Sequence, residues 1–397
     1  MPQQLLFISW DSDSSNYLEN LFFPILKGLQ DRGLIQAYVF QCSWASEEEV
    51  ARIRSLAKDQ GIVYFHQQVS KKPNALFGAY RTVKQARKRI KALCLENDIK
   101  VLMPRSTMPA WIVNGLNGFL KKQEIRVVFD ADGLPIQERV DFGGLKKGGI
   151  LYRLLTEIER KALIRADHII TRSEKSIEWH RKNNPSLGME KFTVVCNGRD
   201  PDFFDFQIES RNQIRKQLGL REKDVLLVHS GSLGESYAPK AIQELIQNFL
   251  KEELPVYLLI LSRNSKYASS LFPEESMERV FIHEVDFNEI PKWLSAGDVG
   301  FSLRTQAPSL CGLSPIKLGE YFMMNLPVIL SPGIGDMDDQ LQSKDFCFFY
   351  RDFRDFQDLK KWLSGLSERK SSPRKYAMDN FSLEKSLDYY QLSLGNL

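Results

Sequence analysis

Short apolar runs alternate with longer stretches of helical periodicity along the first half of the chain. Leu5–Trp10 is an apolar run of the kind expected for a buried parallel strand. From Leu18 to Leu26 the apolar residues recur at helical spacing. Further strands are predicted at Ile35–Phe40, Ile62–Phe65, Val101–Pro104 and Ile125–Asp130. Strands that alternate with helices predict right-handed crossovers and a doubly wound parallel sheet, with ligands beyond the carboxyl ends of its strands.

The same pattern starts again in the second half of the chain. Strands are predicted at Val225–His229, Val256–Leu261, Val280–Ile282, Val299–Leu303 and Val328–Leu330. We place the boundary between the two halves near Asn197 and Gly198. The prediction is therefore an α/β protein with one domain over residues 1–196 and a second over residues 197–381.

Composition sets bounds on what such a protein does. The chain has 397 residues, 43% of them hydrophobic, which is enough for two full cores, and its net charge of +4 is too small to indicate a nucleic-acid partner. The five cysteines are scattered and form no Cys-x-x-Cys pair, which favours a reducing, cytoplasmic location. The N-terminus lacks the pattern of a signal peptide, and no apolar run approaches the roughly 18 residues of a membrane span.

Positive charge gathers in residues 81–100, which we expect to form a basic helix. Only Glu96 and Asp98 oppose the cations of this stretch, which are Arg81, Lys84, Arg87, Lys88, Arg89, Lys91 and Lys100. Such a run is either a solvated helix face or a docking face for anionic lipid headgroups. The second interpretation would place the protein on the inner face of the cell membrane as a peripheral protein.

The most informative stretch runs from Ser314 to Phe322. Pro315 suits the first turn of a helix, and Lys317 and Glu320 are three residues apart and share one helix face. The start of that helix offers free N–H groups to an anion, and Lys317 adds a full charge. Glu320 supplies acceptors for hydroxyl groups one turn further on. A phosphate site followed by a diol site is the layout that a nucleotide-sugar needs.

This stretch resembles the donor-binding motif of the retaining GT-B glycosyltransferases of the family 4 type, also called glycosyl transferases group 1, of the polysaccharide and capsule biosynthesis kind. Three other segments resemble that family in the same order, namely residues 162–173, 194–204 and 228–234. The resemblance implies two Rossmann-like domains that face a cleft, the first binding the acceptor and the second the nucleotide-sugar. It also implies that a helix over residues 382–397 packs back on the first domain.

On the donor side, the resemblance implies a phosphate-binding backbone at the turn after Val228 and several cations. The implied donor-binding residues are Gly231, Ser232, Leu233, Lys240, Arg263, Cys311, Gly312, Leu313, Ser314, Pro315, Ile316, Lys317 and Glu320. Two of these positions depart from the family pattern. Ser232 stands where relatives have Arg, so we expect Arg263 or Arg304 to supply that charge. Gly312 stands where relatives have the first of two glutamates, and backbone N–H groups of residues 309–314 are the expected replacement.

On the acceptor side, Asp130 to Glu138 resembles the family's acidic segment at the end of a strand. An alternative is that Asp130 caps the next loop and that Asp132 with Gly133 is only a turn. Arg105 follows the strand 101–104, where relatives place a basic residue. The expected acceptor-side residues are Trp10, Asp11, Asn16, Arg105, Asp130, Asp132 and Glu138.

We expect no metal and no cofactor besides the donor substrate. The Asp-x-Asp pattern occurs four times, as Asp11/Asp13, Asp130/Asp132, Asp200/Asp202 and Asp336/Asp338, so it is uninformative, and the five histidines show no ligand spacing. The resemblance implies that side chains and a helix dipole stabilise the departing diphosphate. The expected catalytic residues are Lys317, Glu320, Arg304 and Asp132.

The predicted function is transfer of a sugar from a nucleoside-diphosphate sugar to a glycan or lipid-linked oligosaccharide, with retention of configuration. Two alternatives stay open. One is a GT-B epimerase acting on a nucleotide-sugar, which would need carboxylates and a histidine around the sugar. The other is a catalytically silent GT-B subunit, favoured by the unusual residues at positions 232 and 312.

Overall fold

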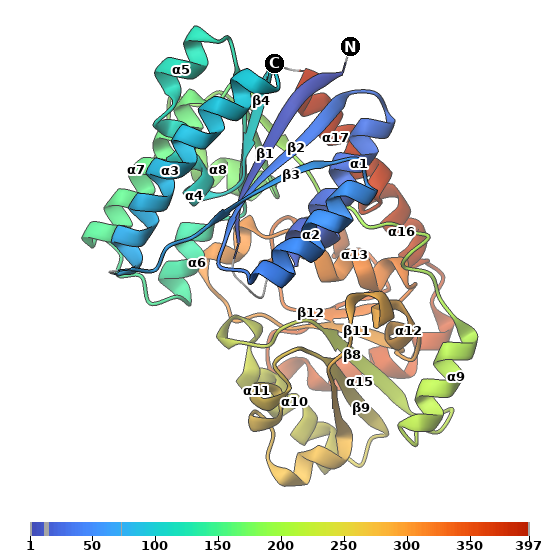
Figure 1. Cartoon of the computed structure of the whole chain (residues 1–397). Coiled ribbons are helices and arrows are strands. Elements are labelled where there is room, and N and C mark those ends of the chain that lie inside the picture. The colour runs from blue at the N-terminus through green and yellow to red at the C-terminus, as the bar shows by residue number, and fades with distance from the viewer. Residues whose placement is uncertain (1, 12–15, 73, 396–397) are drawn as a thin grey trace. The chain divides into compact units, whose positions relative to one another are not determined.

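A computed structural model describes residues 2–11, 16–72 and 74–395 and divides the chain into two compact units (Figure 1). The first unit comprises Met1–Cys196, Cys311–Leu313 and Ser386–Leu397. The second comprises Asn197–Leu310 and Ser314–Lys385. Asp13, a member of one Asp-x-Asp pair, lies outside the described residues.

The first unit is built on a seven-stranded sheet in the order β3-β2-β1-β4-β5-β6-β7, and each neighbouring pair is parallel. The order reverses between β1 and β4, as in doubly wound sheets. Its strands are β1 (Gln3–Asp11), β2 (Ile35–Ser43), β3 (Val63–Gln68), β4 (Val101–Pro104), β5 (Arg126–Asp132), β6 (His168–Thr171) and β7 (Phe192–Val194).

Helices pack on both faces of this sheet (Figure 1). A π-helical turn over Leu18–Phe22 leads into the first of them. They are α1 (Phe23–Asp31), α2 (Glu47–Asp59), α3 (Ala75–Glu96), α4 (Thr107–Asn114), α5 (Asn117–Lys122), α6 (Pro135–Asp141), α7 (Ile150–Arg165), α8 (Glu174–Asn183) and, from Ser386 onward, α17 (Leu383–Gly395).

The basic helix α3 begins and ends earlier than the range 81–100 that the charge pattern suggested. Asn74 fixes its start, because its side chain accepts a hydrogen bond of 2.9 Å from the backbone N–H of Phe77. The helix stops before Asn97, and Asp98 takes a positive φ of 49°. Lys100 therefore stands outside the helix, in the approach to β4.

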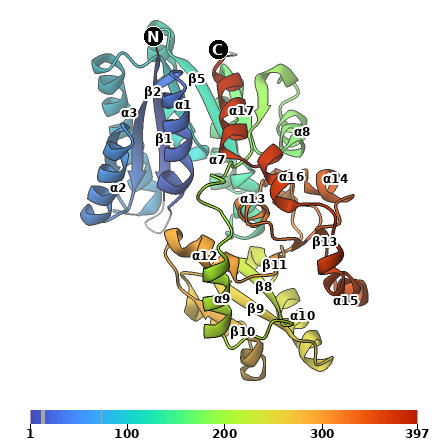
Figure 2. The ribbon, with the colours of Figure 1, turned by 90° about the vertical axis from the view of Figure 1, so that its right-hand side faces the viewer.

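The last helix, α17, is part of the first unit. It lies beside α1 in both views (Figure 1, Figure 2). A Cβ added to Gly28 of α1 would meet Leu387 at 2.5 Å, so α1 and α17 approach each other at a glycine. The hydroxyl of Ser386 donates to the carbonyl of Cys196 at 2.9 Å. The chain end thus covers a face of the sheet that α1 also covers.

The second unit has a six-stranded parallel sheet in the order β10-β9-β8-β11-β12-β13. Its strands are β8 (Val225–Ser230), β9 (Val256–Leu261), β10 (Val280–His283), β11 (Val299–Ser302), β12 (Val328–Leu330) and β13 (Cys347–Phe349). Its helices are α9 (Ile208–Gln217), α10 (Pro239–Lys251), α11 (Ser265–Ser270), α12 (Ile290–Ser295), α13 (Ile316–Met323), α14 (Met337–Leu341), α15 (Phe356–Ser364) and α16 (Pro373–Asn380).

The predicted fold class is confirmed, since two doubly wound parallel sheets carry their helices on both faces. One detail at α13 differs from the prediction. Pro315 is the residue before the helix, with φ −69° and ψ 115°, and Ile316 is the first helical residue. The backbone of Pro315 is extended and not helical, so this residue sets the direction from which the chain enters α13.

Candidate functional site

The loop after β8 and the start of α13 come together around Gly231. This residue has a φ of +124°, and a Cβ built on it would lie 2.9 Å from Cε of Lys317. The Lys317 side chain therefore crosses directly over the backbone of the loop. Only glycine permits both the backbone conformation and this close approach. Two residues 86 positions apart in the chain, Gly231 and Lys317, thus form one surface.

Glu320 positions the side chain of Lys317. Its carboxylate lies 3.3 Å from Nζ of Lys317 and 3.2 Å from Nε of Arg199. The Glu320 side chain is only 1% exposed, whereas 27% of the Lys317 side chain is accessible. A buried carboxylate is tolerated where cations pair with it, and here two do. In this arrangement the Lys317 ammonium is the exposed group of the pair, and Glu320 is enclosed.

Arg304 is the second cation at this place. Its guanidinium carbon lies 3.7 Å from the ring centroid of Tyr237, and that ring contacts His229 edge-on at 5.2 Å. Nε of Arg304 is buried and has no hydrogen-bond partner among the described residues. The guanidinium is therefore fixed by stacking and retains an unused donor.

His229 stays neutral at physiological pH. Burial is the largest cause that lowers its pKa to about 4, and the charges of Lys317 and Arg304 contribute in the same direction. The Tyr237 ring, on which Arg304 stacks, contacts His229. Lys317 crosses over Gly231, two residues further along the chain, so both cations lie near the carboxyl end of β8. An uncharged His229 adds nothing to that positive potential.

The other predicted donor residues are spread along the same edge of the sheet. Lys240 is exposed at the second position of α10, and Arg263 is exposed just after β9. Ser232 is exposed, whereas Leu233 belongs to the hydrophobic core. Because β9, β8 and β11 are neighbours, the segments that follow them carry their cations to one edge.

Residues 311–313 lie in the first unit, although we predicted them as part of the donor site with their neighbours. The hydroxyl of Ser173 donates to the carbonyl of Cys311 at 2.6 Å. A Cβ on Gly312 would be 2.6 Å from Cγ of Leu134, and one on Gly133 would be 2.8 Å from the carbonyl oxygen of Gly312. Two backbones thus meet at a pair of glycines, which explains why no glutamate stands at position 312.

Ser314, in contrast, belongs to the second unit, where its carbonyl accepts a hydrogen bond of 2.7 Å from the side chain of Asn197. Tyr321 connects α13 to β8, because its hydroxyl accepts from the backbone N–H of Ser230 at 2.9 Å. Burial raises the pKa of Tyr321, so its hydroxyl stays protonated. Ile316 is half-buried at the first position of the helix.

A second cluster of charges stands at the carboxyl edge of the first sheet. Arg105 lies 2.7 Å from the carboxylate of Asp132, and Arg172 lies 2.6 Å from that of Asp130. Asp130 also accepts a hydrogen bond of 3.0 Å from the backbone N–H of Asp132. The structure therefore brings together three of the predicted acceptor-side residues, and it adds Arg172.

Arg172 was not predicted as a site residue, although it lies in the segment 162–173 that resembles the family. Its side chain is 2% exposed, and its Nε and Nη1 have no hydrogen-bond partner among the described residues. Burial lowers the pKa of Arg172, but Asp130 more than offsets this, so the pKa lies above its ordinary value. Tyr390 of α17 interacts with the same guanidinium, and burial raises the pKa of that phenol.

The remaining acceptor-side residues are Trp10, Asp11, Asn16 and Glu138, and of these Asp11 interacts electrostatically with Arg105 of the cluster. Asp11 is buried and accepts hydrogen bonds from Ser9 at 2.7 Å and from Gln41 at 2.8 Å. Trp10 contacts Trp44 edge-on at 6.5 Å. Asn16 is half-buried before the first helical turn, and Glu138 is exposed on α6.

Within the described ranges (2–11, 16–72, 74–395), no three or more His, Cys, Asp or Glu side chains gather in a group that would hold a metal ion. No described helix is both long and apolar enough to cross a bilayer.

Comparison with solved structures gives the architecture a name. HepE from Anabaena, solved with UDP and glucose, superposes with a TM-score of 0.71 at 13% identity over all of both chains. The chain has the GT-B fold. A Rickettsia africae glycosyltransferase gives a TM-score of 0.71 at 14% identity, with 99% of this chain and 98% of that chain covered.

WaaG, a glycosyltransferase involved in lipopolysaccharide biosynthesis, has the same GT-B fold, with a TM-score of 0.65 at 17% identity over 98% of this chain and 100% of WaaG. No model of a known protein family matches the chain, and no curated protein sequence matches it either. At identities this low the comparisons establish the GT-B fold alone, and function has to be argued from the site.

Proposed function

We propose that this protein is a retaining glycosyltransferase of the family 4 type, which moves a sugar from a nucleoside-diphosphate sugar to a glycan or lipid-linked acceptor in polysaccharide biosynthesis. The observation that carries the proposal is that Lys317 crosses over the glycine loop at Gly231, while Arg304 stacks on Tyr237, whose ring contacts His229 at the end of the same strand. HepE, which has a similar fold, was solved with UDP-glucose, and a starch synthase of this fold was solved with ADP. Cations at the edge of a sheet, beside a loop whose backbone a ligand can approach closely, are suited to binding a diphosphate.

The donor site performs one main chemical task in this proposal. When the sugar–phosphate bond breaks, negative charge develops on the diphosphate, and fixed cations stabilise it. Lys317 and Arg304 supply that charge directly, and Lys240 and Arg263 add to the potential from the same edge. Glu320 acts as a positioning residue for Lys317. Once the donor draws the Lys317 ammonium away from the Glu320 carboxylate, that carboxylate accepts hydrogen bonds from the donor's hydroxyl groups.

Acceptor binding is assigned to the cluster of Arg105, Asp130, Asp132 and Arg172. The Asp132 carboxylate is 29% exposed, and it is therefore the group of this cluster that is suited to accept a hydrogen bond from an acceptor hydroxyl. No carboxylate is assigned as a covalent nucleophile. The acceptor hydroxyl attacks the anomeric carbon on the face from which the diphosphate departs, so that the bond from carbon to the acceptor oxygen forms as the bond from carbon to the diphosphate oxygen breaks. The departing diphosphate takes up the hydroxyl proton, and attack on that same face retains the configuration of the sugar.

The direct test is to incubate the protein with a panel of UDP-, ADP- and GDP-sugars and to measure release of the nucleotide with and without glycan acceptors. A transferase releases nucleotide slowly from one donor alone and faster with its acceptor. A silent subunit releases none from any donor, which would contradict the proposal.

An epimerase is the second candidate. A putative UDP-N-acetylglucosamine 2-epimerase from Listeria monocytogenes shares the fold, with a TM-score of 0.58 at 11% identity over 98% of this chain and 94% of that chain. Of the five histidines, His229 lies nearest to the proposed donor site, but it is buried and neutral. If the panel yields a new nucleotide-sugar without release of nucleotide, the epimerase is the correct assignment.

We also propose that the protein works in the cytoplasm at the inner membrane face, with α3 as the contact. Arg81, Lys84 and Lys88 are exposed on this helix, whereas Arg87 donates to the carbonyls of Trp111 and Ile112 and is structural. Leu76, Phe77 and Tyr80, on the first turns of α3, are each more than half exposed. Exposed apolar residues beside cations are suited to an anionic bilayer.

A further inference from the structure

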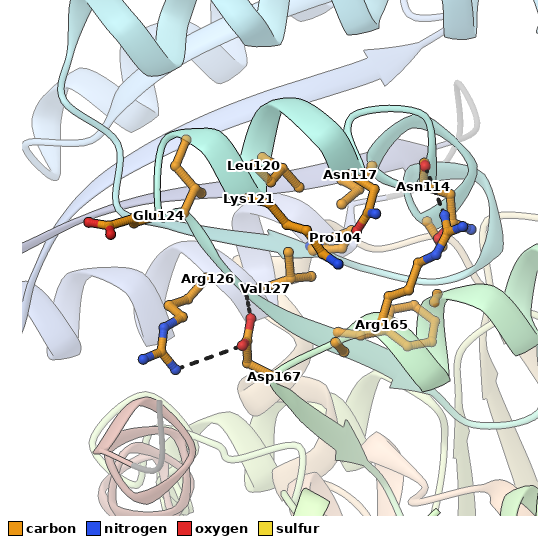
Figure 3. Close-up of a pocket in the computed structure, with 16 residues that line it drawn as sticks. Pro104, Asn114, Asn117, Leu120, Lys121, Glu124, Arg126, Val127, Arg165 and Asp167 are labelled. Atoms are coloured by element: carbon orange, nitrogen blue, oxygen red, sulfur yellow. Dashed lines mark hydrogen bonds and ion pairs between the residues drawn. The ribbon is translucent and has the colours of Figure 1, made fainter. Parts of the chain in front are cut away.

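The first unit contains a pocket of about 620 Å³ that the proposed reaction does not use. It lies among α4, α5, α7 and the strand β5 (Figure 3). Apolar side chains form much of its lining, among them Val113, Leu120, Val127 and Phe129. Its volume falls within the range of small-molecule sites.

The pocket is separate from the cluster at the carboxyl edge of the same sheet. Its charged residues Arg126 and Asp167 stand at the beginnings of β5 and β6, whereas Asp132 and Arg172 stand at or just beyond the ends of those strands. A strand rises by about 3.3 Å per residue, so the seven residues of β5 separate the two places by roughly 20 Å. The occupant of the pocket is therefore a different molecule from the proposed donor and acceptor.

Charge in the pocket is not balanced. One carboxylate oxygen of Asp167 accepts from the backbone N–H of Val127 at 2.8 Å, and the other lies 3.7 Å from Nη1 of Arg126. These two groups satisfy each other. Figure 3 shows Glu124 at the far end of the view, with its carboxylate directed away from Lys121 and Arg165.

Two cations are left for a ligand. Arg165 donates through Nη1 to the carbonyl of Asn114 at 3.1 Å, which fixes its guanidinium and leaves its other N–H groups available. Lys121 makes no ion pair with any described residue, and it extends from α5 across the middle of the group of side chains in Figure 3. A guanidinium held by a hydrogen bond and an exposed ammonium, both lining a pocket with apolar side chains, suit an anion with an apolar body.

We propose that this pocket is a binding site for a small amphipathic organic anion. The apolar body lies against Val113, Leu120 and Phe129, and the anionic group lies between Lys121 and Arg165. The inference does not depend on the proposed function, because it uses none of the donor-site or acceptor-site residues.

The test uses 1-naphthyl phosphate as the probe, titrated into the full chain by isothermal calorimetry. Inorganic phosphate and 1-naphthol are the two half-probes, and both should bind at least tenfold more weakly than the whole. Lys121→Glu and Arg165→Gln should each weaken binding at least tenfold, since each removes a charge-assisted contact.

Lys122→Glu is the matched control, because Lys122 is exposed on the same helix and does not line the pocket. It should change the affinity less than twofold. An unchanged thermal midpoint shows that each variant is folded. The proposal is overturned if the wild type does not bind the probe, if inorganic phosphate binds equally well, or if Lys122→Glu weakens binding as much as Lys121→Glu.

Discussion

At the scale of single residues, position 231 is the one that most strictly requires glycine. A methyl group there would meet the Lys317 side chain at 2.9 Å and would have to adopt a φ of +124°. We expect Gly231→Ala to displace Lys317 and to lower donor affinity roughly tenfold, or about 1.4 kcal/mol. Gly234→Ala is the control, because nothing lies within 4 Å of its Cβ position and its φ is −169°. Equal nucleotide affinities in the two variants would show that Gly231 is not part of the donor site.

Lys317 itself should contribute more. Lys317→Ala removes a charge-assisted contact, which costs about 1.5–3 kcal/mol, or roughly ten- to a hundredfold in donor affinity. Lys251→Ala, an exposed lysine at the end of α10, should leave affinity unchanged. Glu320→Gln should lower donor affinity too, and it should also lower stability because it leaves Arg199 buried without its carboxylate. Donor titrations with wild-type affinity in both Lys317→Ala and Glu320→Gln would place the donor elsewhere.

His180 should make stability depend on pH. Burial lowers its pKa from 6.5 to about 4, so the folded state excludes a proton that the unfolded chain binds below pH 6.5. Stability from this residue is complete above pH 6.5 and is lost as the pH falls toward 4, at about 1.4 kcal/mol per pH unit. We expect the loss of unfolding free energy between pH 7 and pH 5 to be about 2 kcal/mol smaller in His180→Leu than in the wild type. Urea unfolding at both pH values measures this, and parallel losses would show that His180 is not shielded from protons.

At the scale of elements, the apolar pattern located the central strands closely. The bounds of β4, β9 and β12 are those predicted, because these strands are apolar runs that end at the turn before the next helix. Three strands were not among the predicted apolar runs. Strand β6 has four residues. Strands β7 and β13 have three residues each and lie at sheet edges, so they carry too few apolar positions for a pattern. The start of α3 depended on a single capping side chain, Asn74, which hydrophobic periodicity does not register.

The exposed face of α3 should bind anionic lipid. Each Lys or Arg near such a surface contributes about 1 kcal/mol, and the attraction is screened as the Debye length falls to about 8 Å at physiological salt. Charge reversal at Lys84, Lys88 and Lys91 should therefore release the protein from phosphatidylserine liposomes in a sedimentation assay at low salt. The same reversal at Lys216, Lys223 and Lys251, exposed in the second unit, is the control and should not.

A wild-type protein that ignores these liposomes at low salt would leave α3 as a solvated face. Turnover of a soluble acceptor analogue should survive the reversal in either case, because α3 contributes no residue to the proposed donor site.

At the scale of the whole molecule, the sequence predicted local motifs better than it predicted which residues far apart in the chain contact each other. The position of Lys317 and Glu320 on one helix face was predicted from their spacing in the sequence. Arg199 and Arg172 were missed, because each acts through a carboxylate far away in the sequence, 42 positions away for Arg172 and Asp130. Gly312 was recognised as unusual, but only the fold shows that a backbone of the first unit occupies the space of a side chain there.

Independence from metal is a prediction that concerns the whole proposed catalytic assembly. If Lys317, Arg304 and their neighbours carry the diphosphate charge, most activity should remain after treatment with EDTA and passage into metal-free buffer. The measurement is the rate of transfer before and after chelation. Complete loss of activity, reversed by Mn²⁺, would instead assign a role to one of the Asp-x-Asp pairs.

The return of α17 to the first unit has a consequence for how the protein is made. Ser386, Leu387 and Tyr390 are buried, and they are synthesised after every residue of the second unit. Residues 1–196 are synthesised first, yet the face of their sheet beside α1 stays open until α17 has been synthesised. The second unit, complete at Lys385, can fold while the first still waits for its final helix. The nascent first unit therefore exposes apolar surface while residues 197–385 are synthesised.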